Sequence, residues 1–563
     1  MTSQNSTTSS LDERIPTSQN ASKSDLAALA CKPLRVLAVA APDRIAGRKN
    51  SLGLDSTDPA SLFNACRIAA QRTFSVDSAW AQSNWAGGRK EIRKHFALLY
   101  SLDDLPSFTE MLLHVRPNLL LIGAMTLCMP GAVECARRAR DILGNEVIIV
   151  LGGRHATETI YLSPSRIRTP EKILHHRASP ILLARTGRIS GLFDAVVSGE
   201  GEYLIAEIGE IIASIQGTCD VTSIIRNLAP ETPGDWILST VDPNNEVVST
   251  GVPIDRNILP PLAPLFGVSA AFDVFKGRMT AHVFSDTGPG CVYDCSFCSE
   301  RSGVTGRLAD LGNAPTRLYR QLAEAAKVID EDSPGRGASA FVEDSVLLGG
   351  SPRSIDLFCD LLEADPIPIQ FGAQLTIDQI LRRETQVMRL ARVGLKYLFI
   401  GLETFDPVEI GGMSKDLGSR EGSWHLRFRR ALDVLGRFGV ACGCALLFGL
   451  GEAHASRIAL LEAVVTERAK RGNPLALSAN WAVHHPLRGQ VSDPGFDYLK
   501  WGTPEGPMLE LFHNFGEAST EYCLVGTTPP NLEEVKEINQ ALEIFWKNGD
   551  SDTHCTSRPD KKT

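Results

Sequence analysis

Short apolar runs alternate with amphipathic segments along most of the chain. In the first half, four Val- and Leu-rich runs are typical of buried strands: LRVLAVAAP, RPNLLLIGAMT, NEVIIVLGG and FDAVVSGEGE. GAVECARRARDIL carries Val133, Ala136, Ala139 and Leu143 near one helical face, and the helical YLIAEIGEIIASI follows the last run. Strands that alternate with helices predict an open, doubly wound parallel sheet over residues 34–225, whose ligands bind beyond the carboxyl ends of the strands.

A second alternating region predicts a separate domain. Residues 226–280 are rich in proline and are expected to form a linker. Over residues 281–500, strand-like runs such as TAHVFSDTG, ASAFVEDSVLL, LKYLFIGLET and VACGCALLFGL alternate with helical segments. This repeat predicts a full or partial (β/α) barrel, with its chemistry at the carboxyl ends of the strands. Residues 1–33 are expected to be a disordered tail, and residues 501–563 a helical extension with a polar end.

Net charge and hydropathy limit the kinds of partner that this protein is expected to bind. The 563 residues carry a formal net charge of -9, which offers no basic footprint for nucleic acid. No apolar run approaches the roughly 18 residues that span a bilayer, and the N-terminus lacks the apolar core of a signal peptide. We therefore expect a soluble, cytoplasmic protein that acts on a small molecule, without nucleic acid or membrane as a partner.

Three of the 13 cysteines form a cluster in SDTGPGCVYDCSFCSER, whereas most of the others stand alone in apolar stretches. Cys291, Cys295 and Cys298 give the spacing C-x3-C-x2-C, one thiolate fewer than a structural zinc or an ordinary cuboidal cluster needs. A [4Fe-4S] cluster on three cysteines keeps one iron open to another ligand. Zinc or chance clustering is the alternative, although no further Cys or His follows until Cys359.

This stretch resembles the radical S-adenosylmethionine (SAM) enzymes, and the resemblance implies that SAM chelates the open iron and is cleaved to a 5'-deoxyadenosyl radical. It also assigns roles to residues in matching motifs. Phe297 would lie near the adenine, and His484 and His485 in WAVHHPLRG would be acid or base groups for the substrate. Two of the candidates for SAM contact, Glu343 and Asp344, follow a strand-like run, and the alternative role for such an acidic pair is to cap the N-terminus of a helix. The remaining candidates for SAM contact are Glu403, Gly449, Gly451 and Glu452.

The first region resembles the Rossmann-like cobalamin-binding domains that precede such barrels in class B radical SAM methyltransferases. LLLIGAMT, VIIVLGGRHATE and FDAVVSGEGE carry this resemblance. It implies that glycines admit the corrin or its nucleotide tail and that polar side chains line the rim. No D-x-H-x-x-G motif is present, so the resemblance gives no lower ligand for cobalt, and another nucleotide or no ligand remains an alternative. The implied contacts are Thr126, Gly152, Gly153, His155, Gly199 and Glu200.

Together the two resemblances imply a methyl transfer from SAM, by way of cobalamin, to an unactivated carbon of a small metabolite, as in natural-product biosynthesis. A flavodoxin or ferredoxin is implied as electron donor. Three alternatives remain. The first is a rearrangement, cyclisation or ring contraction without methylation, and the second is a radical SAM enzyme whose N-terminal domain only binds substrate or a partner. The third is a non-catalytic iron-sulfur or corrinoid sensor. The sequence does not identify the substrate.

Overall fold

The computed structural model describes most of residues 96–547 and short parts of the chain before them. The described residues are 33–42, 67–68, 71–72, 78, 80, 96–99, 101–163, 167–215, 219–266, 268, 273–288, 290–305, 308–405, 407, 413–486, 488–489, 494–501 and 522–547. The predicted N-terminal tail lies outside them except for Pro33, as does the polar C-terminal end. None of the described helices is long and apolar enough to cross a membrane.

The first domain is built on a mixed sheet with the strand order β2-β1-β3-β4-β7-β8-β9 in the described part of the chain. β1 to β4 and β7 are parallel, and β8 and β9 are antiparallel additions at one edge. All four predicted strands of this domain are present, which confirms the Rossmann-like architecture. The bounds are β1 (Val36–Ala40), β2 (Phe96–Leu98), β3 (Leu119–Gly123), β4 (Ile148–Gly152), β7 (Ala195–Gly199), β8 (Trp236–Ser239) and β9 (Val247–Val248).

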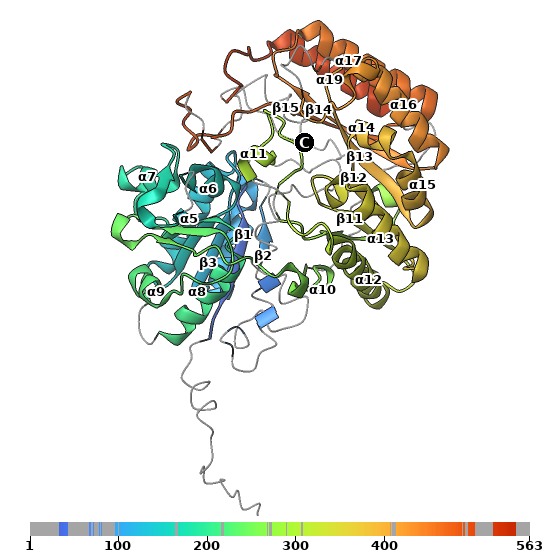
Figure 1. The fold of residues 1–563 in the computed structure, drawn as a ribbon. Helices are drawn as coiled ribbons and strands as arrows, with labels where there is room; N and C mark the ends of the chain where they lie inside the picture. The colour runs from blue at the N-terminus through green and yellow to red at the C-terminus, as the bar shows by residue number, and fades with distance from the viewer. Residues whose placement is uncertain are drawn as a thin grey trace, which may run out of the picture.

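Helices cover both faces of this sheet (Figure 1). One core lies between the sheet and α4, α5 and α7, and a second lies between the sheet and α8. These helices pack because their apolar positions fall on one side, as the sequence of α5 predicts. The bounds are α4 (Leu105–Val115), α5 (Met129–Leu143), α6 (Arg154–Thr159), α7 (Pro180–Arg185), α8 (Glu202–Ser214) and α9 (Val221–Asn227), with the hairpin β5 (Ile160–Leu162) and β6 (Ile173–His175) after α6.

Part of the expected linker belongs to the first sheet. β8 and β9 lie within residues 226–280, and β8 pairs with β7 from Val196 to Gly199. Their short runs, WILS and VV, are separated by a proline-containing turn, which made the region look irregular from the sequence. The first domain therefore extends at least to Val248.

The second domain is a parallel half-barrel. In the described residues its strands β10 to β15 follow one another in chain order and all pair in parallel. This confirms the predicted partial barrel. The bounds are β10 (Met279–Val283), β11 (Ala338–Val342), β12 (Ile369–Gln374), β13 (Leu395–Glu403), β14 (Ala441–Phe448) and β15 (Ala476–Trp481).

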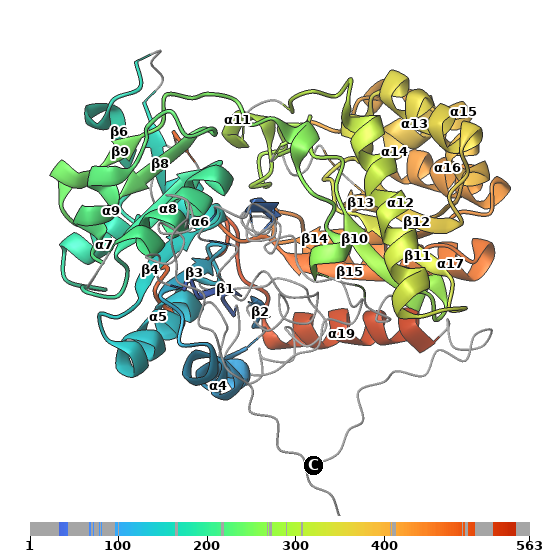
Figure 2. The ribbon, with the colours of Figure 1, turned by 90° about the horizontal axis from the view of Figure 1, so that it is seen from below.

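Helices α12 to α17 lie on the outer side of the half-barrel, and the two domains stand side by side (Figures 1 and 2). One large apolar core joins these helices to the strands, and α19, the predicted C-terminal helix, packs against α17. The bounds are α10 (Ala263–Phe266), α11 (Ser302–Thr305), α12 (Ala314–Asp332), α13 (Pro352–Ala364), α14 (Ile377–Arg382), α15 (Glu384–Arg392), α16 (Trp424–Arg437), α17 (His454–Arg471) and α19 (Leu532–Lys547). Single 3-10 turns lie at 102–104, 170–172, 243–245, 256–258, 273–275, 347–350 and 419–421.

Candidate functional site

The three clustered cysteines lie in one loop, residues 284–301, directly after β10; we call it the cysteine loop. Their thiols are free, and the Cys298 amide donates to the Cys295 carbonyl over 3.1 Å, which closes a turn between the second and third cysteine. Burial raises the pKa of all three thiols, and repulsion from Cys291 and Cys295 contributes to raising that of Cys298 to about 12. The thiols are therefore close enough to act on one another and are sheltered from water.

The donor set suits a cluster better than a single metal ion. Among the residues that the structure describes, no three His, Cys, Asp or Glu side chains are close enough together to hold one ion. Zinc would need four ligands at about 2.3 Å from one centre. A cuboidal cluster instead takes each thiolate on a different iron, so its ligands stand further apart. One buried and two half-buried thiols on one loop fit the latter requirement.

Lys415 is a buried cation beside the cysteine loop that the sequence analysis did not single out. Its Nζ lies 2.5 Å from Oε2 of Glu403, and both side chains are buried. The positive charge of Lys415 opposes the effect of burial on the pKa of all three thiols. The adjacent Ser414 hydroxyl accepts a hydrogen bond from the Asp294 amide over 3.0 Å. Lys415 and Glu403 thus form a buried ion pair next to the thiols.

The acidic pair after β11 does not cap a helix. The following 3-10 turn begins after Val346, and Ser351 caps α13. Asp344 instead accepts hydrogen bonds from the amide of Ser285, over 3.0 Å, and from its hydroxyl, and burial raises the pKa of Asp344 to about 6. Glu343 Oε1 lies 2.5 Å from Nδ1 of His282, a partner that the sequence did not reveal. These carboxylates fix the start of the cysteine loop; their contact with SAM stays a prediction.

Glu452 organises the turn after β14. Its carboxylate accepts hydrogen bonds from the amides of Gly449 and Leu450, each over 2.8 Å, and pairs with Arg457 over 2.5 Å. Gly449 has φ +79°, and a Cβ there would lie 2.4 Å from Trp481 Nε1, so only glycine fits. Gly451 is exposed at the tip of the turn. Glu452 therefore holds the predicted adenine wall in place rather than pointing at a ligand.

Phe297 is half-buried and packs against the core of the half-barrel from inside the cysteine loop, directly before Cys298. Its predicted contact with adenine is untested.

His155 and Thr126 bond to each other inside the first domain rather than lining its rim. His155 is fully buried, with Nδ1 3.2 Å from Thr126 Oγ1 and Nε2 3.1 Å from the carbonyl oxygen of Ala178. Burial lowers the pKa of His155 to about 4, so the ring is neutral. Both ring nitrogens are engaged, so neither is available to a metal in this arrangement.

The glycines at this edge allow the backbone of the domain to approach itself. A Cβ on Gly153, at φ +94°, would lie 2.6 Å from the Ala124 amide nitrogen, and one on Gly199, at φ +84°, would lie 2.0 Å from the Asp235 carbonyl oxygen. Gly152 has more room, with 3.7 Å to the nearest atom. Glu200 forms an ion pair with Arg256. The close approach observed here is internal, and contact with a corrin stays a prediction.

His484 and His485 follow β15 and are both half-buried. His484 Nδ1 lies 3.0 Å from the Tyr498 hydroxyl, and the ring of Tyr498 also contacts the edge of His155, with centroids 6.1 Å apart. Burial, together with the positive charge of Arg154 and the neighbouring His484, lowers the pKa of His485 to about 4. His485 is therefore a neutral imidazole in the region where the two domains meet.

Arginines of the first domain hold the cysteine loop near both of its ends. Arg67 pairs with Asp286 over 2.7 Å, with both side chains almost completely buried. Arg154, directly after the glycine pair of β4, forms an ion pair with Glu300, two residues beyond Cys298. Neither arginine was singled out by the sequence, because a charged residue gives no sign that its partner lies far along the chain.

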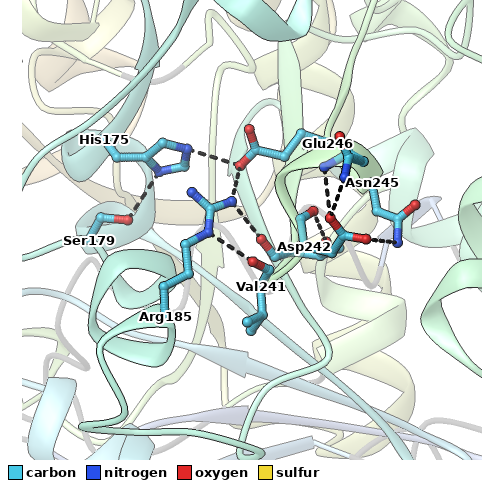
Figure 3. Close-up of polar contacts among 9 residues, drawn as sticks. His175, Ser179, Arg185, Val241, Asp242, Asn245 and Glu246 are labelled. Carbon is cyan, nitrogen blue, oxygen red and sulfur yellow. Dashed lines mark hydrogen bonds and ion pairs between the residues drawn. The ribbon is translucent and has the colours of Figure 1, made fainter.

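A separate polar cluster fixes the β5–β6 hairpin to the segment before β9 (Figure 3). His175 Nε2 lies 2.9 Å and Arg185 Nη2 3.1 Å from Glu246 Oε1, and His175 Nδ1 lies 3.3 Å from Ser179 Oγ. Serine, histidine and glutamate thus stand in the order of a hydrolase triad, but Ser179 is fully buried and out of reach of a substrate. The cluster is structural.

The fold and the site define a two-domain α/β protein in which a Rossmann-like domain precedes a parallel half-barrel with three cysteines after its first strand. No protein-family model and no curated protein matches the chain. Among solved structures it is similar to OxsB, a cobalamin-dependent SAM radical enzyme with aqua-cobalamin and SAM bound, at 14% identity over 77% of this chain and 52% of that one, with a TM-score of 0.44. The chain thus spans about half the length of OxsB.

TsrM from Kitasatospora setae, a radical SAM methyltransferase with tryptophan and a SAM analogue bound, is 14% identical over 80% of this chain and 73% of that one, with a TM-score of 0.46. Methylornithine synthase (PylB) is 17% identical over 49% of this chain and 84% of that one, with a TM-score of 0.27. The chain is thus structurally similar to cobalamin-dependent radical SAM enzymes over about 80% of its length, and the likeness is one of fold.

Proposed function

We propose that this protein is a cobalamin-dependent radical SAM enzyme that methylates an unactivated carbon of a small metabolite. The observation that carries the proposal is the ion pair between Arg154 and Glu300. It joins the turn after β4, where an α/β sheet binds its ligand, to the loop with the three thiols. One substrate between the domains would therefore meet both ligand-binding edges.

Each domain would bind one of the two cofactors. Cys291, Cys295 and Cys298 would hold a [4Fe-4S] cluster and leave one iron for SAM, and the turns after β3, β4 and β7 would hold cobalamin. When bound, these groups supply a 5'-deoxyadenosyl radical and a methyl group. The buried pair of Arg67 and Asp286 anchors the cysteine loop, which would hold a bound cluster in one position.

His485 is the residue we assign to proton transfer at the substrate. It is neutral at pH 7, because burial lowers its pKa to about 4, so it can accept a proton only as a weak base. His484 orients the segment, because its backbone N–H donates to the Tyr522 carbonyl over 2.6 Å and its ring contacts Tyr498. An electron donor, a flavodoxin or ferredoxin, completes the proposal.

Anaerobic reconstitution with iron, sulfide and hydroxocobalamin, followed by desalting and metal analysis, tests the two cofactors. About four irons and one cobalt per chain are expected. Formation of 5'-deoxyadenosine from SAM then tests the radical chemistry, and transfer of labelled methyl tests the reaction. Four irons without retained corrinoid would overturn the methylation proposal, and a chain that binds both groups without cleaving SAM would be a sensor.

A further inference from the structure

Arg488 reaches from the half-barrel side of the molecule to the first domain. It follows β15 by seven residues, and its Nε donates to the carbonyl oxygen of Thr157 over 2.8 Å. The next amide, that of Gly489, donates to the Tyr161 hydroxyl over 3.2 Å. Residues 488–489 are therefore docked on α6 and β5 of the first domain.

The contact point lies at the carboxyl edge of the first sheet. The Thr157 hydroxyl donates to the Gly153 carbonyl at the end of β4, over 3.2 Å, and accepts from the Gly199 amide at the end of β7, over 3.1 Å. Arg154, three residues before Thr157, pairs with Glu300 of the cysteine loop. Arg488 thus stands where ligands of α/β sheets bind and close to the loop that carries the thiols.

Most of the hydrogen-bonding capacity of Arg488 is unused. A guanidinium has five N–H donors. Among the described residues, the bond from Nε to Thr157 is the one hydrogen bond of this side chain, and neither terminal nitrogen has an ion-pair partner. The side chain is nevertheless half-buried. The open fork of a half-buried guanidinium can donate two parallel hydrogen bonds to an oxyanion.

Among the described residues, no carboxylate pairs directly with Arg488. Burial lowers its pKa, and the positive charge of Arg154 adds to the effect. The carboxylates of Asp235 and Glu158 act in the opposite direction. Asp235 is itself engaged, 2.5 Å from Arg168, and Glu158 is buried within α6. The Tyr161 hydroxyl, which accepts from the Gly489 amide, also acts on Arg488.

We propose that Arg488 is the centre of an anion-binding site between the two domains, which takes a phosphate or carboxylate group on its open fork. Planar guanidinium and two oxygens of such a group match in geometry, which a lysine does not reproduce. Two ligands carry this chemistry: cobalamin, through the phosphodiester of its nucleotide tail, and an acidic substrate. The choice between these sources rests on the proposed function; the existence of the site does not.

Calorimetric titration of the full chain with inorganic phosphate at pH 7 tests the site. Arg488→Gln should weaken phosphate binding by about tenfold or more, since charged hydrogen bonds are lost. Arg488→Lys keeps the positive charge but not the planar fork, so its affinity for phosphate should lie between those of the wild type and Arg488→Gln. Arg188→Gln is the matched control, because Arg188 already has a carboxylate partner, Asp497, at 2.8 Å, and should bind phosphate as the wild type does. Equal binding by wild type and Arg488→Gln would overturn the proposal, as would an equal loss in the control.

The source of the anion is found by comparing cobalamin with cobinamide, which lacks the nucleotide tail and its phosphodiester. If the site takes the tail, Arg488→Gln weakens the binding of cobalamin but not of cobinamide, and phosphate competes with cobalamin. If the site takes a substrate acid, both corrinoids bind unchanged, and the cobalamin-loaded protein still binds phosphate through Arg488. If the wild type retains no corrinoid, the methylation proposal fails. The anion-binding site at Arg488 is still tested, because the phosphate titration does not depend on cobalamin.

Discussion

Arg154, in the first domain, forms an ion pair with Glu300, which lies two residues beyond Cys298 in the second domain. The pair places one charge of each sign beside the thiol cluster. Arg154 also opposes, through its positive charge, the rise in the pKa of Cys298 that burial causes. The immediate surroundings of a bound cluster would therefore include a residue from the domain that we expect to hold cobalamin.

This pair predicts opposite shifts of the cluster potential. Arg154→Gln removes a positive charge and should lower the reduction potential, because the reduced cluster is the more negative state; Glu300→Gln should raise it. Each shift should be on the order of tens of millivolts, and the double variant should return close to the wild type. A redox titration followed by electron paramagnetic resonance measures the potentials. Shifts of the same sign in both single variants would show that the loop has moved rather than changed its charge.

Removal of one cysteine should abolish the cluster. Cys298→Ala leaves two thiols, too few to hold a cuboidal cluster, so iron and the brown absorbance of the reconstituted protein should fall to background. The matched control is Cys219→Ala, because Cys219 is also a half-buried cysteine but lies far along the chain from the cysteine loop. The control should keep about four irons per chain. Equal iron in both variants would assign the metal to another place.

The buried pair of Lys415 and Glu403 should be strongly coupled in stability. Lys415→Met leaves the Glu403 charge buried without its partner and should lower the free energy of unfolding by about 3 kcal/mol. Adding Glu403→Gln to Lys415→Met should recover part of this loss. Urea denaturation at pH 7 measures both.

The control for that cycle is Lys547→Met, which breaks an exposed pair with Glu543 and should cost less than about 1 kcal/mol. Additive losses for Lys415 and Glu403 would contradict a direct interaction between them.

His155 should make the protein less stable in acid. Its pKa is lowered to about 4 in the folded state, against an ordinary value of 6.5, so the unfolded chain binds the proton first as the pH falls. This contribution is fully present above pH 6.5 and is lost between pH 6.5 and 4, which amounts to about 2 kcal/mol between pH 7 and pH 5. In His155→Gln the difference in unfolding free energy between these two pH values should shrink by that amount.

The control for the pH effect is His114→Gln, since His114 is exposed on α4. It should leave the difference between pH 7 and pH 5 unchanged. A His155→Gln variant with the pH dependence of the wild type would show that this ring is not the group that titrates.

The strands and the thiol cluster could be predicted because both are local in sequence. Parallel strands buried on both faces appear as continuous apolar runs, and LLLIG and IIVLG are found as β3 and β4. β8 and β9 were missed because two- to four-residue runs beside prolines carry no periodic signal.

The charged parts of the site could not be predicted. Arg67 and Asp286 are 219 positions apart, and nothing local marks either of them as buried. Nothing in the sequence around Lys415 indicates that it is buried beside Glu403 either. For His155, a polar residue after a glycine pair was expected at the rim, whereas the structure directs it inward to Thr126 and Ala178. Whether such a polar side chain is buried depends on partners that lie far away in the sequence.

The two arginines that hold the cysteine loop set an order of assembly. Arg67 and Arg154 leave the ribosome before any of Cys291, Cys295 and Cys298, and N-terminal domains generally fold first during synthesis. The first domain can thus serve as a template on which the loop closes as the half-barrel forms. A half-barrel expressed alone would have to fold with Asp286 lacking its buried arginine, so we expect it to be less stable than the same half-barrel in the whole chain.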